Sequence, residues 1–339
     1  MRDLLEMRPA AGAHRVAVRA AVGVAVPLLV LWAIGRLDWS IYACFGAFTS
    51  LFGRNHAGVP RLQLQAWVGL LLVGCTTVGT LIGISPARAW IAVPCAAALA
   101  AGATALSDRY DWHPPGSLFP IFALGGCASL ASTSGDLLPA FVVSVASAGF
   151  SVLVGSAGAL VRSHGRLAGE RVRPGTVHPA QLRHAVRGAA AVGVAGAVAT
   201  LAGIGHPYWA MVSAVVPLVS RDPRVQLVRG LHRVVGTAMG LGLSAALLAA
   251  HLPSAGIIVT VVVLQAGAEM LVGRNYAVAL IFVTPLALLM GQLARPQPLG
   301  PLLTDRGIET LIGVVIGIAV GVLTRRPRTA DRWHHRRHG

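Results

Sequence analysis

The chain has 339 residues, of which 55% are hydrophobic and only 12% are charged. A soluble globular domain carries about 25% charged residues, so this composition excludes a soluble enzyme, a disordered basic tail and a secreted disulfide scaffold. The 28 basic residues are all arginine, they outnumber 12 acidic residues, and the net charge is +16. These arginines fall between apolar segments, which indicates membrane orientation and not binding to nucleic acid. The sequence therefore predicts an integral membrane protein.

The apolar segments predict an all-α polytopic membrane helix bundle with about twelve transmembrane segments. In chain order they cover residues 16–34, 40–52, 64–84, 89–106, 117–131, 137–161, 184–204, 208–220, 231–250, 254–272, 276–292 and 307–323. A helix needs about 20 residues to span the hydrocarbon core, and most segments approach that length. Segments 40–52 and 208–220 are short. They are either thin, tilted spans or half-helices that enter and leave on one side.

The arginines favour twelve complete crossings. If every segment crosses, 24 of the 28 arginines lie on the side of the two termini, and four (Arg36, Arg88, Arg295 and Arg306) lie on the other. If the two short segments turn back, the division falls to 16 against 12. Since arginine accumulates on the cytoplasmic side, we expect both termini in the cytoplasm.

The two halves of the chain resemble each other. Residues 20–25 and 190–195 have the identical sequence Ala-Ala-Val-Gly-Val-Ala, and Gly69 aligns with Gly236 at an offset close to that of the hexapeptide. Further matches pair Tyr42 with Trp209, Arg54 with Arg221, Pro120 with Pro285 and Asp136 with Asp305. Each half has six segments, so the halves are expected to be parallel repeats. The expected divisions are a first repeat (1–161), a cytoplasmic linker (162–183), a second repeat (184–323) and an Arg/His-rich tail (324–339).

A motif in the second half resembles a known family. A Tyr-Trp-Ala sequence (208–210) opens a short segment, and a basic loop and the pattern Arg-x-x-Gly-Thr-x-x-x-Gly follow (Arg233, Gly236, Thr237 and Gly240). An Arg-Asn-Tyr sequence (274–276) and a Thr-Pro pair (284–285) come later. This stretch is similar to the fusaric acid resistance (FUSC) family of membrane proteins, which includes aromatic acid exporters. The resemblance implies a multi-pass transporter in a bacterial-type plasma (inner) membrane.

Two arginines are candidates for binding an anionic substrate. Arg229 and Arg233 are four residues apart, so they share one face of a helix at the predicted cytoplasmic end. A guanidinium presents a planar set of donors that fits a carboxylate. The alternative is that both side chains extend to lipid headgroups and only anchor the helix.

Glu269 and Glu309 are the two acidic residues within predicted segments. Glu269 lies one turn after Gln265 and is a candidate for proton coupling, because carboxylates within membranes often relay protons. Alternatively, it pairs with Arg274 or Arg233 and neutralises that charge. Glu309 lies in the first turn of its segment, where acids stabilise a helix N-terminus, and we interpret it as structural.

Several polar and aromatic residues are candidates for a substrate path. Tyr208 and Trp209 are expected at the outer interface, where they form part of an aromatic belt or stack on an aromatic substrate. Asn275, Tyr276 and Thr284 lie in or beside segment 276–292 and are expected to line a path.

Glycines at a spacing of four residues predict close packing between helices. They are Gly236 and Gly240, and also Gly313, Gly317 and Gly321. The four cysteines have no ligand spacing, and the tail histidines His334, His335 and His338 have no acidic or cysteine partners. We therefore expect neither a metal site nor a cofactor.

The resulting hypothesis is a transporter that exports small organic or aromatic acids and is coupled to protons through Glu269. A passive anion channel on the same scaffold and a non-transporting membrane scaffold are the alternatives. No enzyme motif occurs in the sequence, and we do not expect catalysis. The expected partners are the lipid bilayer and a small organic anion, not nucleic acid. A homo-oligomer is left open.

Overall fold

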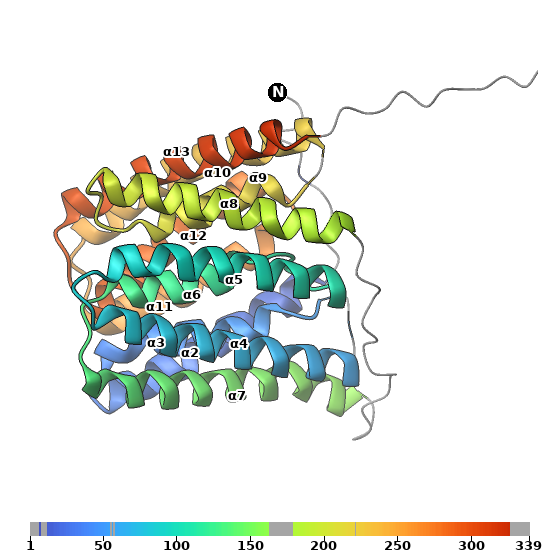
Figure 1. Cartoon of the computed structure of the whole chain (residues 1–339). Helices are drawn as coiled ribbons and strands as arrows, with labels where there is room; N and C mark the ends of the chain where they lie inside the picture. Colours follow the sequence, from blue (N-terminus) through green and yellow to red (C-terminus); the bar gives the residue numbers. More distant parts are fainter. Residues whose placement is uncertain are drawn as a thin grey trace, which may run out of the picture.

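The fold is a bundle of α-helices (Figure 1). The computed structural model describes residues 7, 12–54, 56, 58–162, 179–220 and 222–325, without the side chains of 158–162. Within these residues there are twelve α-helices, three short 3-10 helices and no strand. The predicted all-α class is therefore confirmed. Most of the predicted linker, nearly all of the predicted tail with its three histidines, and Arg221 lie outside the described residues.

The twelve helices coincide one to one with the twelve predicted segments. The first half contains α2 (Ala13–Ala33), α3 (Ser40–Ala47), α4 (Val59–Gly83), α5 (Arg88–Tyr110), α6 (Leu118–Ser129) and α7 (Leu137–Arg162), with the 3-10 helices η1 (Leu37–Trp39), η2 (Phe48–Leu51) and η3 (Ser134–Asp136). The second half contains α8 (Pro179–Leu201), α9 (Tyr208–Leu218), α10 (Pro223–Ala249), α11 (Ser254–Leu271), α12 (Tyr276–Ala294) and α13 (Leu299–Leu323). Nine helices of the described chain are long and apolar enough to cross a membrane.

Three helices are short and lie in the interior. They are α3 with 8 residues, α6 with 12 and α9 with 11, so the segment that contains α6 joins the two that were expected to be short. All eight residues of α3 and ten of the eleven residues of α9 are buried. A helix enclosed by protein does not have to cover the hydrocarbon thickness, because its neighbours and not lipid surround it. The short helices therefore form a core that the long helices enclose.

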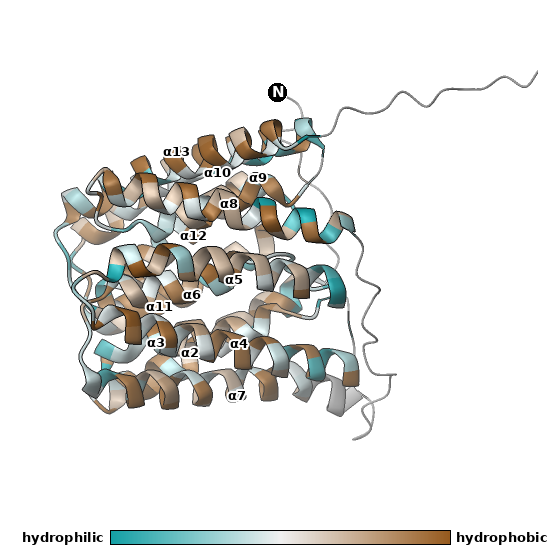
Figure 2. Cartoon of the chain, viewed as in Figure 1, coloured by the Kyte–Doolittle hydropathy of each residue, from teal (hydrophilic) through white to brown (hydrophobic). Residues whose placement is uncertain are grey.

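The outer surface of the long helices is apolar. Large side chains such as Leu70, Leu138 and Val315 are more than half exposed. Figure 2 shows hydrophobic residues along the helices that face the viewer, with hydrophilic residues gathered toward the helix ends. An apolar surface of this extent is stable in lipid and unstable in water. The fold is that of a multi-pass membrane protein.

The helices of the two halves pack in the same pairs. Helix α4 packs on α6 as α10 packs on α12, and α3 packs on α7 as α9 packs on α13. Two further contacts join the halves reciprocally, since α5 packs on α8 and α11 packs on α2. In Figure 1, α7 and α13 lie at opposite edges of the bundle.

Glycine contacts give a residue-level alignment of α4 with α10. A Cβ atom on Gly69 would lie 3.6 Å from Ala148 of α7, and one on Gly230 would lie 3.0 Å from Val314 of α13. By contact, Gly69 therefore corresponds to Gly230 and not to Gly236, the residue that the sequence alignment paired with it. The connection from α9 to α10 is shorter than that from α3 through η2 to α4, and the offset between the two glycines is 161 residues instead of 167.

Candidate functional site

Arg233 lies inside the second half of the bundle. It is 3% exposed, its Nε donates to Ser213 Oγ of α9 at 3.3 Å, and its Nη1 donates to the hydroxyl of Tyr276 at 3.2 Å. Helix α10 starts after Asp222, whose carboxylate accepts a hydrogen bond from the amide of Arg224 and caps the helix. Arg233 is ten residues after Pro223, the first residue of α10, which places it about 15 Å along the helix axis. Its guanidinium therefore links α9, α10 and α12 within the protein.

Arg306 of α13 is a second buried cation, and the sequence analysis missed it. It is 1% exposed, and its Cζ atom lies 3.7 Å from the ring centroid of Trp209. Its Nε and Nη1 atoms are buried and have no hydrogen-bond partner in the described part of the chain. Arg306 was assigned to the outer surface with three other arginines. The sequence does indicate that Arg306 is buried, because Arg306 lies on the same helix face as Gly313 and Gly317, which were predicted to pack against another helix.

Arg233 and Arg306 are electrostatic neighbours. The hydroxyls of Tyr208 and Tyr276 also lie near Arg306. These cations are contributed by helices that start from opposite ends of the bundle, α10 and α13. The pair brings positive charge to the middle of the second half.

Glu309 lies one turn from Arg306 and is fully buried. Its Oε1 accepts a hydrogen bond from the backbone amide of His206 at 3.0 Å, while its Oε2 has no partner among the described residues. The unpaired oxygen of Glu309 and the unpaired donors of Arg306 are not bonded to each other. Helix α13 begins at Leu299, ten residues before Glu309, so the interpretation of Glu309 as a helix N-terminal acid is wrong.

The loop between α8 and α9 connects Glu309 with the surface. Asp305 Oδ2 accepts from the amide of Gly205 at 3.2 Å and lies 3.5 Å from Nδ1 of His206. The side chains of His206 and Asp305 are 15% and 22% exposed. Burial lowers the pKa of His206 below its ordinary value, although the neighbouring Asp305 opposes this shift. The imidazole is consequently neutral near pH 7.

Glu269 lies in a separate cluster at the other end of the bundle. It forms an ion pair with Arg54, which follows η2 in the first half. The expected partners were Arg274 or Arg233, and the observed partner is 215 residues away in the chain. Gln265, one turn before Glu269, is buried, and its Oε1 has no partner within the described ranges. Glu269 and Arg233 are thus not brought together.

The remaining candidates have mixed environments. Asn275 caps α12, since its Oδ1 accepts from the amides of Ala277 and Val278 at 2.9 and 3.2 Å. Thr284 is buried against Gly240 of α10. Arg229 is half-buried.

The glycines of the predicted packing motif lie at close helix contacts. A Cβ atom on Gly236 or Gly240 would clash with α12, and one on Gly313 or Gly317 would clash with the backbone of α9. Gly321 faces Gln226 of α10.

Tyr208 and Trp209 lie where the two halves meet. Phe122 of α6 stacks on Tyr208 at 6.0 Å with an interplanar angle of 16°, and its ring lies 4.8 Å from that of Trp209. Trp209 is thus held between an aromatic side chain of the first half and the guanidinium of Arg306. These contacts place both aromatic residues inside the protein and not in a belt that faces lipid.

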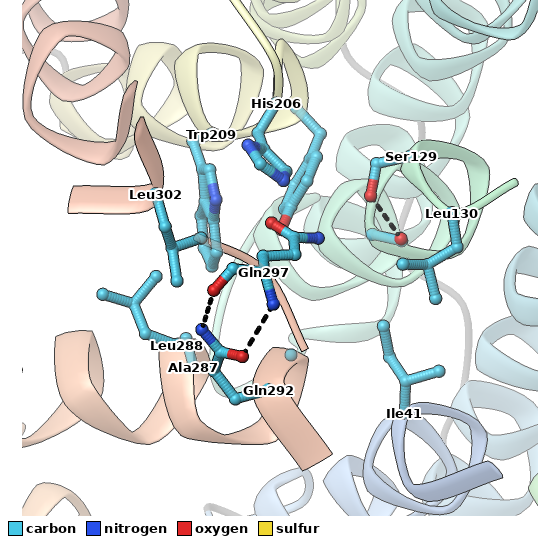
Figure 3. A pocket seen from close by; sticks show the side chains of 13 residues that line it. Ile41, Ser129, Leu130, His206, Trp209, Ala287, Leu288, Gln292, Gln297 and Leu302 are labelled. Carbon is cyan, nitrogen blue, oxygen red and sulfur yellow. Dashed lines mark hydrogen bonds between the residues drawn. The ribbon is translucent and has the colours of Figure 1, made fainter. Parts of the chain in front are cut away.

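Two cavities adjoin these aromatic residues. The smaller one, about 30 Å³, lies between α3, α6, α9 and α12 (Figure 3), where Gln292 and Gln297 bond to each other beside His206 and Trp209. This volume holds one or two waters and not an organic acid. The larger one, about 280 Å³, has Arg88 and Tyr208 in its wall and approaches the size of small-molecule sites. Neither cavity is lined by Arg233 or Arg306.

The fold and these side chains define a class of protein, a multi-pass membrane protein with buried cationic groups in its second half. Residues 194–320 match a family model described as fusaric acid resistance protein-like. This match confirms the resemblance that the sequence motif predicted, and it covers the part of the chain that contains Arg233, Arg306 and Glu309. No curated protein and no solved structure matches the chain in the same comparisons.

Proposed function

We propose that the protein transports small organic acids, aromatic acids among them, across the membrane as anions. The observation that carries this proposal is the pair of buried guanidinium groups, Arg233 and Arg306, of which Arg306 has two unbonded donors. An unpaired cation in a membrane protein is costly and is typically part of a substrate or ion pathway. The match to the fusaric acid resistance protein-like family supports the same class of substrate.

A carboxylate fits these groups chemically. Its two oxygens accept parallel hydrogen bonds from one guanidinium, which gives strong and directional binding. Trp209 lies against Arg306 and offers an aromatic face beside the proposed carboxylate position. An aromatic acid satisfies both features at once.

The packing of the helices supports a transport mechanism. The reciprocal contacts α5–α8 and α11–α2 are those expected of two parallel six-helix repeats, residues 1–161 and 184–323, that move relative to each other. Neither of the two cavities reaches the arginines. The larger cavity, with Arg88 at its wall, is the proposed exit toward the outer side. Export from a bacterial-type plasma membrane, with both termini cytoplasmic, completes the proposal.

Efflux of radiolabelled benzoate from vesicles containing the purified full-length protein tests the proposal. We expect Arg233→Gln and Arg306→Gln to reduce efflux at least about tenfold, the loss expected when a charged hydrogen bond worth about 1.5–3 kcal/mol is removed. Arg36→Gln is the matched control, because Arg36 is exposed, forms an ion pair with Asp38 and lies over the ring of Trp39, far from the proposed anion site in the sequence. Efflux by Arg306→Gln at the wild-type rate would contradict the assignment.

The same preparation separates the alternatives. A benzoate current in planar bilayers that follows voltage and ignores a pH gradient would identify a passive channel. Absence of benzoate flux together with a stoichiometric protein partner would identify a membrane scaffold.

A further inference from the structure

Glu309 is the acidic side chain closest to the proposed anion site. It is fully buried, one of its oxygens is unpaired, and it lies one helical turn from Arg306. Building on the proposed function, we infer that Glu309 is a proton-binding site that takes up a proton when an organic anion binds beside Arg306. Glu309, and not Glu269, would then link proton binding to substrate binding.

The charged and titratable groups around Glu309 determine the sign of this linkage. Asp305 and Arg306 lie on its own helix, Tyr208 and His206 face it from α9 and the preceding loop, and Arg233 and Tyr276 surround Arg306 from α10 and α12. With both arginines protonated and both carboxylates ionised, the cluster has no net charge. An incoming carboxylate makes the cluster negative, and one proton on Glu309 restores neutrality.

The short separation between the substrate carboxylate and Glu309 also favours protonation of Glu309. Two anions close together in a site shielded from water repel strongly, so a substrate carboxylate favours the protonated form of a neighbouring glutamic acid. Thermodynamic linkage makes the effect reciprocal, and protonation of Glu309 tightens anion binding by the same factor. Binding of the proton and binding of the anion therefore favour each other.

His206 and Asp305 are the titratable groups between Glu309 and the surface. The His206 amide is bonded to Glu309, its ring lies 3.5 Å from Asp305, and both side chains are partly exposed. A neutral imidazole has one donor and one acceptor nitrogen and is able to pass a proton on. Both residues lie at the end of the bundle formed by the α8–α9 loop, which is the predicted external side.

Glu269 has the opposite environment. Its carboxylate is already compensated by the ion pair with Arg54, and it contacts neither Arg233 nor Arg306. Binding of an anion at the arginine pair leaves its charge unchanged.

Calorimetric titration of the purified full-length protein with benzoate tests the inference. Between about pH 5.5 and pH 8 the wild-type Kd should rise by up to about tenfold per pH unit, the limit for one linked proton. Titration in two buffers with different ionisation enthalpies should show uptake of up to one proton per benzoate. Glu309→Gln should bind benzoate with a pH-independent Kd and no proton uptake. Asp136→Asn, which changes a half-buried acidic residue of the first half, should retain the wild-type behaviour.

The outcomes separate the inference from the proposed function. Wild-type binding without proton uptake, or uptake that persists in Glu309→Gln, overturns the role of Glu309. The buffer comparison on the wild type decides this even if the variant does not fold. Benzoate binding by Arg306→Gln with the wild-type Kd overturns the anion site itself.

Discussion

The two halves of the molecule use the same helix packing around cores of different chemistry. Gly313 contacts the backbone of Ala210 in the second half, and Ser147 contacts the backbone of Ala43 in the first. Gly313 and Ser147 are 166 residues apart in the sequence. The same offset pairs Arg306 with Ala140. The offset of 161 between Gly69 and Gly230 pairs Arg233 with Leu72. Leu72 and Ala140 are both fully buried.

Aromatic side chains fill the core of the first half. Phe45, Phe48, Phe52, Phe119, Phe122 and Trp112 form a chain of mostly edge-to-face contacts. The scaffold is therefore stable without buried charge at these positions. We therefore expect Arg233, Arg306 and Glu309 to serve function and not folding, and the predictions below test this difference between the halves.

The largest expected effect is that of removing a single buried charge. Arg306→Ala leaves Glu309 without its neighbouring cation and opens space beside Trp209. We expect the free energy of unfolding to fall by about 3–5 kcal/mol, because an uncompensated buried charge remains. Denaturant unfolding of the purified protein in detergent measures this change. A loss below about 1 kcal/mol would contradict the burial of the pair.

Replacing the whole cluster by its first-half counterparts should restore stability without function. The triple variant Arg233→Leu, Arg306→Ala and Glu309→Val installs the residue types of Leu72, Ala140 and Val143. Because apolar replacement of a complete buried ionic group is often neutral or stabilising, we expect unfolding close to that of the wild type and no benzoate binding. If the triple variant is less stable than Arg306→Ala alone, the charges are needed for folding.

A smaller effect is expected at a helix contact between a glycine and a serine, in which the two residues have opposite positions in the two halves. Gly46 of α3 faces Ser147 of α7, whereas in the second half Ser213 of α9 faces Gly313 of α13. Gly313→Ser should cost about 1–3 kcal/mol by overpacking. The double variant Ser213→Gly and Gly313→Ser reproduces the first-half arrangement and should recover most of the loss.

The unfolding free energies of both variants measure this exchange. Gly242→Ala is the control, since nothing lies within 4 Å of an added Cβ there. Additive losses in the double variant would show that the two interfaces are not equivalent.

The smallest effect concerns His206. Burial holds its pKa below the ordinary value, so the native protein binds fewer protons than the unfolded chain below about pH 6.5. Stability contributed by the neutral ring is complete above that pH and declines as the pH falls toward the native pKa. His206→Gln should flatten this part of the stability profile measured from pH 7.5 to about pH 5. An unchanged profile would show that His206 is not the group that titrates.

The sequence predicted the helices well and the site only in part. Apolar runs identified all twelve helices, because nine of them are long and apolar enough to cross a membrane and the three short ones are buried in the protein core. The run 117–131 hid the shortness of α6, since Leu130 is as apolar as a helical residue but has extended backbone. Arg233 and Tyr276 were predicted separately, and their hydrogen bond was not, because 43 residues separate them. Arg306 was missed because its neighbour Asp305 and its position near a helix end are typical of a surface loop.

The position of a bound ligand tests the central claim most directly. Diffraction data from crystals grown with 4-bromobenzoate locate the bromine by its anomalous signal. The account predicts a carboxylate between the guanidinium groups of Arg233 and Arg306, with the bromine near Trp209. A bromine in the cavity beside Arg88 alone, with both guanidinium groups unchanged, would contradict it.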